Sequence, residues 1–161
     1  MEKFKRVSAY LWSAVLVIVD QVIKLGVVSN IKNESITIIK GILRFTYCEN
    51  KGVAFSLGNG HVPVFIVVNL LMICGLVFYY EKNKNDFKGL LNKIFFIMVI
   101  AGGVSNLLDR IFRGFVVDFI DVSELFSFAI FNVADIFIVA GIIGLAVCML
   151  FPQFGNVGRK E

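Results

Sequence analysis

Apolar residues in this chain are gathered into four long runs instead of being spread at helical or strand spacing. The runs cover residues 7–28, 62–80, 90–108 and 134–151, and the second contains no charged residue. A helix needs roughly 20 apolar residues to cross the hydrocarbon core of a bilayer, and each run is close to that length. The pattern therefore predicts four transmembrane helices in a single domain that spans residues 1–161.

The two longer connections between these runs are residues 29–61 and 109–133. Within the first, residues 35–39 and 42–47 are rich in Ile, Thr, Phe and Tyr, and the Lys-Gly pair between them is typical of a turn. This predicts two short strands. The second connection mixes acidic residues with large apolar ones, which we interpret as a loop that lies on the membrane surface and folds back toward the helices. The expected fold is an all-α membrane protein with a small extracytoplasmic β-sheet.

Basic residues are more numerous on one side of the predicted helices, and a membrane protein carries its excess of Lys and Arg on the cytoplasmic side. Nine lie at the two termini and around the connection between the second and third helices: Lys3, Lys5, Arg6, Lys82, Lys84, Lys88, Lys93, Arg159 and Lys160. Six lie in the two longer connections: Lys32, Lys40, Arg44, Lys51, Arg110 and Arg113. We therefore expect both termini in the cytoplasm and both longer connections on the outer side.

Composition supports a membrane protein over a water-soluble one. Hydrophobic residues make up 58% of the chain and charged residues only 17%, whereas a soluble domain has about 25% charged residues. The net charge of +4 forms no basic patch interleaved with aromatic residues, which argues against nucleic acid as a partner. The three cysteines show no paired spacing and His61 is the only histidine, so we expect no metal site. The basic N-terminus resembles a signal peptide but lacks a clean cleavage site, which predicts a retained first helix.

Polar residues near the outer ends of the apolar runs are candidates for chemistry, because a charged group inside a bilayer is costly. Asp20 and Lys24 have the i,i+4 spacing of an ion pair within a helix, which either orders the bundle or contacts a substrate. Asn50 and Gly52 suit a tight turn, and the alternative is that Asn50 points its amide into a site. Both pairs are therefore supporting candidates.

A second group of polar residues follows the third apolar run. Asn106 and Arg110 are four residues apart, so both can lie on one face of a helix. Asp109 and Arg110 either form an ordinary surface ion pair or position a substrate or a catalytic carboxylate.

Two aspartates stand among large apolar residues at apparent membrane boundaries: Asp118 in a Val-Val-Asp-Phe-Ile stretch and Asp135 at the head of the fourth run. Two carboxylates in one partly desolvated site tend to share a proton. One can then take a proton from water while the other donates to a carbonyl oxygen, which hydrolyses an amide without a metal. Intramembrane acids also occur in proton-coupled transporters, and a non-enzymatic membrane assembly factor is a further alternative.

The sequence resembles the lipoprotein signal peptidase family, also called signal peptidase II, along essentially the whole chain. Five motifs in order carry the resemblance: Asp20-Gln21-x-x-Lys24, Asn50-x-Gly52-x-Ala54-Phe55, Asn106-x-x-Asp109-Arg110, Val116-Val117-Asp118-Phe119-Ile120 and Phe131-Asn132-x-Ala134-Asp135. Any one of them would be weak alone, and their combination is highly specific.

The resemblance implies an aspartyl endopeptidase of the bacterial plasma membrane that needs no cofactor. Asp118 and Asp135 match the family's catalytic aspartates, and Asp20 matches a supporting polar residue. Four further polar residues match positions that line the family's active site, namely Asn50, Asn106, Arg110 and Asn132. Asp109 is expected to order the turn at Arg110. The implied substrate is a prolipoprotein whose cysteine carries a diacylglyceryl group, cut on the N-terminal side of that cysteine, in contact with membrane lipid and near the extracytoplasmic face. No oligomeric partner is implied.

Two positions depart from the family pattern. Val53 stands where the family commonly has Ala, and Ser105 stands where it commonly has Gly. Both are modest increases in size, and we expect them to affect the shape of the substrate pocket rather than the chemistry.

Overall fold

The computed structural model describes residues 2–32, 34–52, 61–84, 87, 89–125 and 127–155, with side chains from residue 8 onward. Four long helices account for most of these residues: α1 (Glu2–Ile31), α2 (Val62–Lys82), α3 (Leu90–Arg113) and α4 (Val133–Leu150). Each is long and apolar enough to cross a membrane, which confirms the four predicted transmembrane helices. A short helix, α5 (Pro152–Gly155), follows α4.

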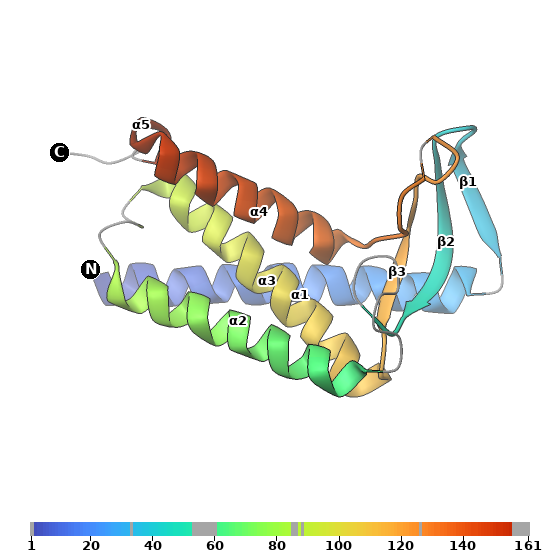
Figure 1. Ribbon diagram of the computed structural model, residues 1–161, viewed down its shortest axis with the longest axis horizontal. Coiled ribbons are helices and arrows are strands. Elements are labelled where there is room, and N and C mark those ends of the chain that lie inside the picture. The colour runs from blue at the N-terminus through green and yellow to red at the C-terminus, as the bar shows by residue number, and fades with distance from the viewer. Residues whose placement is uncertain are drawn as a thin grey trace.

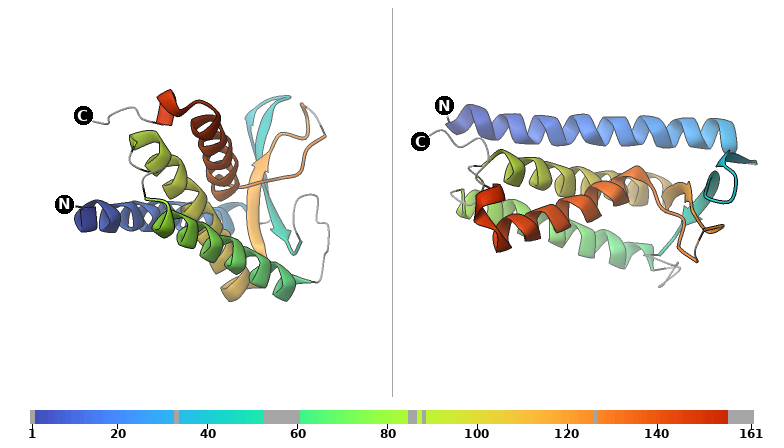
Figure 2. Two further views of the ribbon diagram at one scale, coloured as in Figure 1. Left: turned by 60° about the vertical axis from the view of Figure 1, so that its left-hand side comes forward. Right: turned by 90° about the horizontal axis from the view of Figure 1, so that it is seen from above.

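The helix α3 lies at the centre of the bundle and packs against α1, α2 and α4. Figures 1 and 2 show the β-sheet at one end of the bundle, and the start of α1 together with α5 at the opposite end. The two longer connections therefore meet on one side of the molecule, where the sequence places the outer loops.

Three helices are longer than predicted, and α2 exceeds its prediction by only two residues. The helix α1 continues to Ile31 instead of ending at Val28, and α3 continues to Arg113 instead of ending at Leu108. The sequence boundary at Leu108 was wrong because charged side chains follow it, and these charges are partnered inside the protein. Gly114 ends α3 with a positive φ of 77°, a conformation that an L-residue with a Cβ rarely adopts.

The sheet has three antiparallel strands in the order β1-β2-β3: β1 (Ser35–Ile39), β2 (Leu43–Asn50) and β3 (Val116–Asp121). The two predicted strands are thus present, and Gly41 in the turn between them has a φ of 77°. The third strand corrects the prediction of a surface loop over 109–133. Its Val, Phe and Ile side chains favour a strand, and it pairs with β2 so that Cys48 stands opposite Asp118.

The additional turn of α1 supports the sheet. Val27 and Ile31 pack against Val117 and Phe119 of β3 in one buried apolar cluster. Phe45 of β2 joins it through an edge-to-face contact with the Phe119 ring, with the ring centroids 5.7 Å apart. The strand that carries Asp118 is therefore fixed to the end of a transmembrane helix.

Glycines allow α3 and α4 to approach closely. A Cβ on Gly102 would lie 2.3 Å from the backbone oxygen of Ala134, and one on Gly141 would lie 2.5 Å from the Val99 side chain. Small residues at such contacts let helix backbones pack tightly in lipid. The contact at Gly102 also sets the start of α4 beside α3, where Asn132 and Asp135 are positioned.

Adding one methyl group at Gly102 should separate these helices. We expect Gly102→Ala to lower the free energy of unfolding by about 1–3 kcal/mol, because the added Cβ meets a backbone atom that cannot rotate away. The control is Gly26→Ala on α1, where nothing lies within 4 Å of the new Cβ. Thermal unfolding of both variants in detergent measures the difference, and equal midpoints would contradict the tight contact.

Candidate active site

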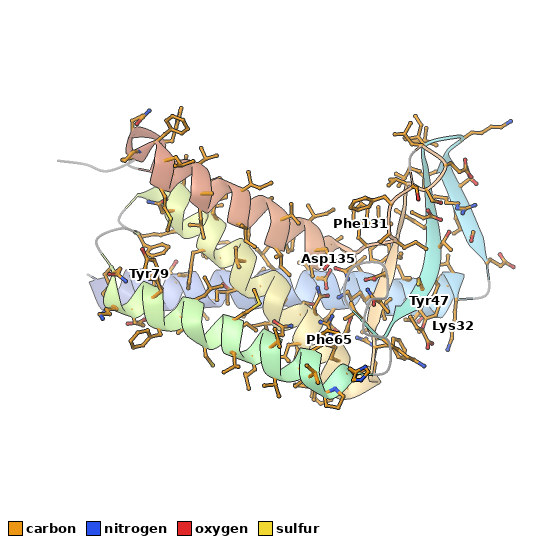
Figure 3. All side chains as sticks on the ribbon, viewed as in Figure 1. Lys32, Tyr47, Phe65, Tyr79, Phe131 and Asp135 are labelled. Atoms are coloured by element: carbon orange, nitrogen blue, oxygen red, sulfur yellow. The ribbon has the colours of Figure 1, made fainter. Side chains whose placement is uncertain are left out.

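A cavity of about 740 Å³ opens among α2, α3, α4 and β3. Its walls are mostly apolar, and its polar lining consists of Asn50, Asn69, Asn106, Arg110, Asp118 and Asp135. Figure 3 labels Asp135, Phe65 and Phe131 where the helices meet the sheet. The structure thus brings both predicted catalytic aspartates to one apolar cavity at the sheet end of the bundle.

Asp118 reaches the cavity from β3 and is 2% exposed. Its two oxygens accept hydrogen bonds from the side-chain amides of Asn50 (2.9 Å) and Asn132 (2.7 Å). Burial, followed by the charge of Asp135, raises the pKa of Asp118 to about 7. A carboxyl group with this pKa can hold or release a proton near neutral pH.

Asp135 lies in the first turn of α4. Its carboxylate accepts hydrogen bonds from the Asn132 backbone N–H (3.1 Å) and from the Asn106 side chain (2.8 Å). In return, the Asn132 side chain accepts a hydrogen bond from the Asp135 backbone N–H (2.9 Å), which completes a capping box at the start of the helix. The helix terminus therefore fixes the orientation of Asp135.

Asn132 connects the two aspartates. Its oxygen is occupied by the α4 cap, so its nitrogen must point the other way, and that nitrogen donates to Asp118 and to the Asn106 oxygen (3.2 Å). One fully buried residue thus binds both carboxylates, Asp118 through its side chain and Asp135 through its backbone N–H.

Lys24 lies beneath this pair and is fully buried. Its ammonium group is 2.9 Å from a carboxylate oxygen of Asp20 and 2.9 Å from one of Asp109, and it donates to the Asn106 oxygen at 3.0 Å. The predicted ion pair of Asp20 and Lys24 is confirmed, and the contact with Asn106 extends it toward the cavity. Because Lys24 holds the Asn106 oxygen, the Asn106 nitrogen is free to donate to Asp135.

The two acids that hold Lys24 also join separate parts of the chain. Asp20 accepts from the Ala134 backbone N–H (3.0 Å) and from the Ser105 hydroxyl (2.5 Å). Asp109 accepts from the Val117 backbone N–H (3.2 Å) and pairs with Arg113. These contacts bind α1 to α4 and α3 to β3. Among the described residues, Asp109 therefore fixes the strand that carries Asp118 rather than the turn at Arg110.

Arg110 forms part of the cavity wall, one helical turn beyond Asn106. Its guanidinium donates to the Gly52 carbonyl oxygen at 3.1 Å and lies 6.0 Å from the centroid of the Phe65 ring. The Gly52 backbone N–H donates to the Asn50 side-chain oxygen at 3.0 Å, while the Asn50 nitrogen binds Asp118. Both interpretations of Asn50 are thus realised in one side chain, since it shapes the turn and also reaches the site.

Asp121 differs from Asp118 although both lie on β3. Burial raises the pKa of Asp121, but hydrogen bonds from Ser123 and Arg44 outweigh it and lower the pKa to about 2. The Arg44 Nε lies 2.7 Å from the carboxylate. Asp121 is absent from the cavity lining, so this acid stays charged in an ion pair outside the site.

The sequence interpretation missed several residues of the site. The hydroxyl of Ser105 bonds Asp20 and also accepts from the Gln21 amide at 2.9 Å. It is therefore a member of the buried network, which corrects the expectation that it shapes the pocket. Phe65 and Asn69 of α2 were also missed, and an isolated Asn inside the uncharged run 62–80 was the one available signal. Val53 lies outside the described residues.

Within the described ranges, no group of three or more His, Cys, Asp or Glu side chains is placed to hold a metal ion.

Comparisons with known proteins identify the family of this chain. The family model described as signal peptidase (SPase) II matches residues 12–151. A lipoprotein signal peptidase of Fusobacterium nucleatum is 36% identical over 138 residues, covering 85% of this chain and 82% of that protein. One of Clostridioides difficile is 36% identical over 137 residues, covering 84% and 90%. A solved structure described as a bacterial membrane enzyme, at 2.3 Å resolution, superposes with a TM-score of 0.77 at 29% identity, covering 96% of this chain and 93% of that one.

Fold and site together define a multi-pass membrane protein with a pair of acids beside an apolar cavity. The chain belongs to the signal peptidase II family and is a peptidase. Neither the transporter nor the assembly-factor alternative fits this membership.

The buried lysine should be essential for the integrity of the site. We expect Lys24→Met to lower the free energy of unfolding by about 3–5 kcal/mol, because buried Asp20 loses its counter-charge and buried Asp109 keeps only Arg113. The matched control is Lys32→Met, which removes an exposed ammonium from the same region of the chain and should change stability by less than about 1 kcal/mol. Chemical denaturation in micelles compares the two, and similar losses would contradict the structural role of Lys24.

Proposed function

We propose that this protein is an intramembrane aspartyl endopeptidase that removes the signal peptide from diacylglyceryl-modified prolipoproteins. It cuts the peptide bond on the N-terminal side of the lipid-modified cysteine, with Asp118 and Asp135 as the catalytic pair. The observation that carries the proposal is the position of these two carboxylates, which bind the side-chain amide and the backbone N–H of one buried residue, Asn132, and line one apolar cavity.

The reaction follows from the properties of the pair. With one proton shared between them, one aspartate takes a proton from water as the water oxygen attacks the scissile carbonyl carbon, and the other donates a proton to the carbonyl oxygen. The tetrahedral intermediate then collapses: the cysteine nitrogen leaves with a proton from the aspartate that accepted one from water, and a hydroxyl of the intermediate returns its proton to the other aspartate, which leaves a carboxyl group on the signal peptide and restores the shared proton. The amides of Asn50, Asn106 and Asn132 hold the carboxylates throughout.

The apolar walls of the cavity suit a lipid-modified substrate. Cavity-lining residues on α4 run from Asp135 to Ile143, which is roughly 12 Å along the helix. On α2 they run from Phe65 to Met72. A scissile bond can therefore reach the acids while the acyl chains and the apolar signal segment remain among the transmembrane helices. Arg110 and Phe65 lie at the wall of this cavity.

We place the protein in the bacterial plasma membrane with both termini in the cytoplasm. The excess of basic residues at the termini and between α2 and α3 supports this orientation. The sheet and the cavity then lie near the extracytoplasmic face, where a precursor exported across the membrane presents its cleavage site.

Replacing either acid by its amide should abolish cleavage. We expect Asp118→Asn and Asp135→Asn each to lower kcat by about a hundredfold or more, because an amide cannot exchange the proton that the reaction needs. Release of the signal peptide from a diacylglyceryl-modified precursor by purified enzyme is the measurement, with the unmodified precursor as the substrate control.

The matched control variant is Asp121→Asn, which removes a carboxylate from the same strand but outside the cavity and should retain most of the activity. Substantial turnover by Asp118→Asn together with loss at Asp121 would assign the catalytic acid of β3 to Asp121. Wild-type cleavage of the unmodified precursor alone would contradict the proposed substrate.

Activity should decline as the pH rises through about 7. The raised pKa of Asp118 keeps a proton on the pair below this value, and the proton is lost above it. The hydrogen bond from Asn50 lowers the pKa of Asp118, so Asn50→Ala should move the alkaline limb of the profile to higher pH. The logarithm of kcat/KM plotted against pH gives the limb directly. An unmoved limb in Asn50→Ala would show that another group controls it.

A further inference from the structure

Asn69 is the one amide side chain within the apolar length of α2, and neither the catalytic pair nor the buried network uses it. It lies seven residues from the start of the helix, which is roughly 10 Å into the bilayer from that end. A polar side chain at such a depth is costly unless it is partnered or functional. Asn69 is half-buried and lines the cavity.

The side-chain amide of Asn69 is only partly satisfied by the protein. Its nitrogen donates to the Gly103 carbonyl oxygen of α3 at 3.1 Å. This leaves one N–H and the side-chain oxygen, and that oxygen accepts no hydrogen bond from any residue that the structure describes. Phe65 and Met72, four residues before and three after on α2, line the same cavity, so the side of α2 that carries Asn69 faces it.

The position of Asn69 relative to the catalytic pair follows from α3. Its partner Gly103 lies three residues before Asn106, which is roughly 4.5 Å along the helix axis. Asn106 in turn binds Asp135. Asn69 therefore lies about one helical turn deeper in the membrane than the acids, a distance that one or two residues of an extended peptide would span.

A substrate peptide in this groove has a corresponding need. To reach the acids, the residues before the scissile bond must leave helical conformation, and their N–H and C=O groups then lack intrahelical partners. In a groove with little water, each unpaired backbone group costs several kcal/mol. A diacylglyceryl group offers only acceptor oxygens, so the side-chain oxygen of Asn69 can be satisfied by the N–H groups of the peptide but not by the lipid.

We infer that Asn69 is a substrate-binding residue whose side-chain amide binds a backbone N–H of the signal peptide within the four residues before the modified cysteine. This inference rests on the proposed function and deepens it. It adds to the apolar cavity a residue that binds the peptide backbone independently of the lipid. It does not depend on side-chain identity in the signal peptide.

The test measures binding in an Asp118→Asn background, so that no substrate is consumed. The probes are a diacylglyceryl-modified precursor peptide and a series in which the backbone N–H of each of the four residues before the cysteine is replaced in turn by an ester oxygen. We expect Asn69→Leu to raise the Kd of the all-amide peptide about tenfold. At one position the ester should raise the Kd by a similar factor when Asn69 is present, and by less than about twofold in Asn69→Leu.

Leu71→Met is the matched control, because Leu71 lies on the exposed face of α2 outside the cavity lining, so the variant should keep both the Kd and the effect of the ester. Asn69→Ser is a second variant, too short to make both contacts, and should also lose the effect of the ester. If Asn69 only packs α2 against Gly103, Asn69→Leu will raise every Kd by one common factor and each ester will keep its full effect, which overturns the inference alone. Absence of binding when Asn69 is intact would contradict the proposed function, and this inference with it.

Discussion

The structure depends on a single ammonium group that is buried among three oxygen atoms. Lys24 has no access to water, and its contacts to Asp20, Asp109 and Asn106 use its three N–H donors. A charge in this position is stable only because two carboxylates surround it, and each of those carboxylates is itself anchored to a distant part of the chain. Removal of the ammonium would therefore release the contacts of α1 with α4 and of α3 with β3 together.

This arrangement separates the charges that hold the fold from those that take part in the chemistry. Asp20 and Asp109 are neutralised by cations and stay within the protein, whereas Asp118 and Asp135 face the cavity and are bound by neutral amides. Neutral donors orient a carboxylate without supplying a full positive charge, so one proton can still be shared between the two acids. Asn106 is the link, since its oxygen meets the lysine and its nitrogen meets Asp135.

Much of the fold was predictable because each transmembrane helix corresponds to a run of about 20 mostly apolar residues in the sequence. The ion pair of Asp20 and Lys24 was predictable for a similar reason, as both partners lie on one helix. The strand β3 was missed because it pairs with β2 across some seventy residues of sequence, and its acidic residues suggested a loop. The last turn of α3 was missed because the charges of Asp109 and Arg113 were interpreted as the end of the membrane-spanning segment. In the structure, Asp109 forms an ion pair with a lysine from another helix. Such pairings between distant segments leave no periodic signal.

The double role of Asn132 has a consequence for which amino acids position 132 can tolerate. Aspartate could cap α4 equally well, but it would bring a third negative charge against Asp118 and offers no N–H to it. Serine could also cap the helix, yet its single hydroxyl proton cannot serve Asp118 and Asn106 together. Glutamine carries the same amide, but its additional methylene would move that amide away from the cap. Because Asn132 is fully buried, the surrounding atoms leave no room for the longer side chain. Of the residues that begin helices well, only asparagine meets all of these demands. We therefore expect related proteins to keep asparagine at this position even where the neighbouring lipid-facing residues of α4 vary.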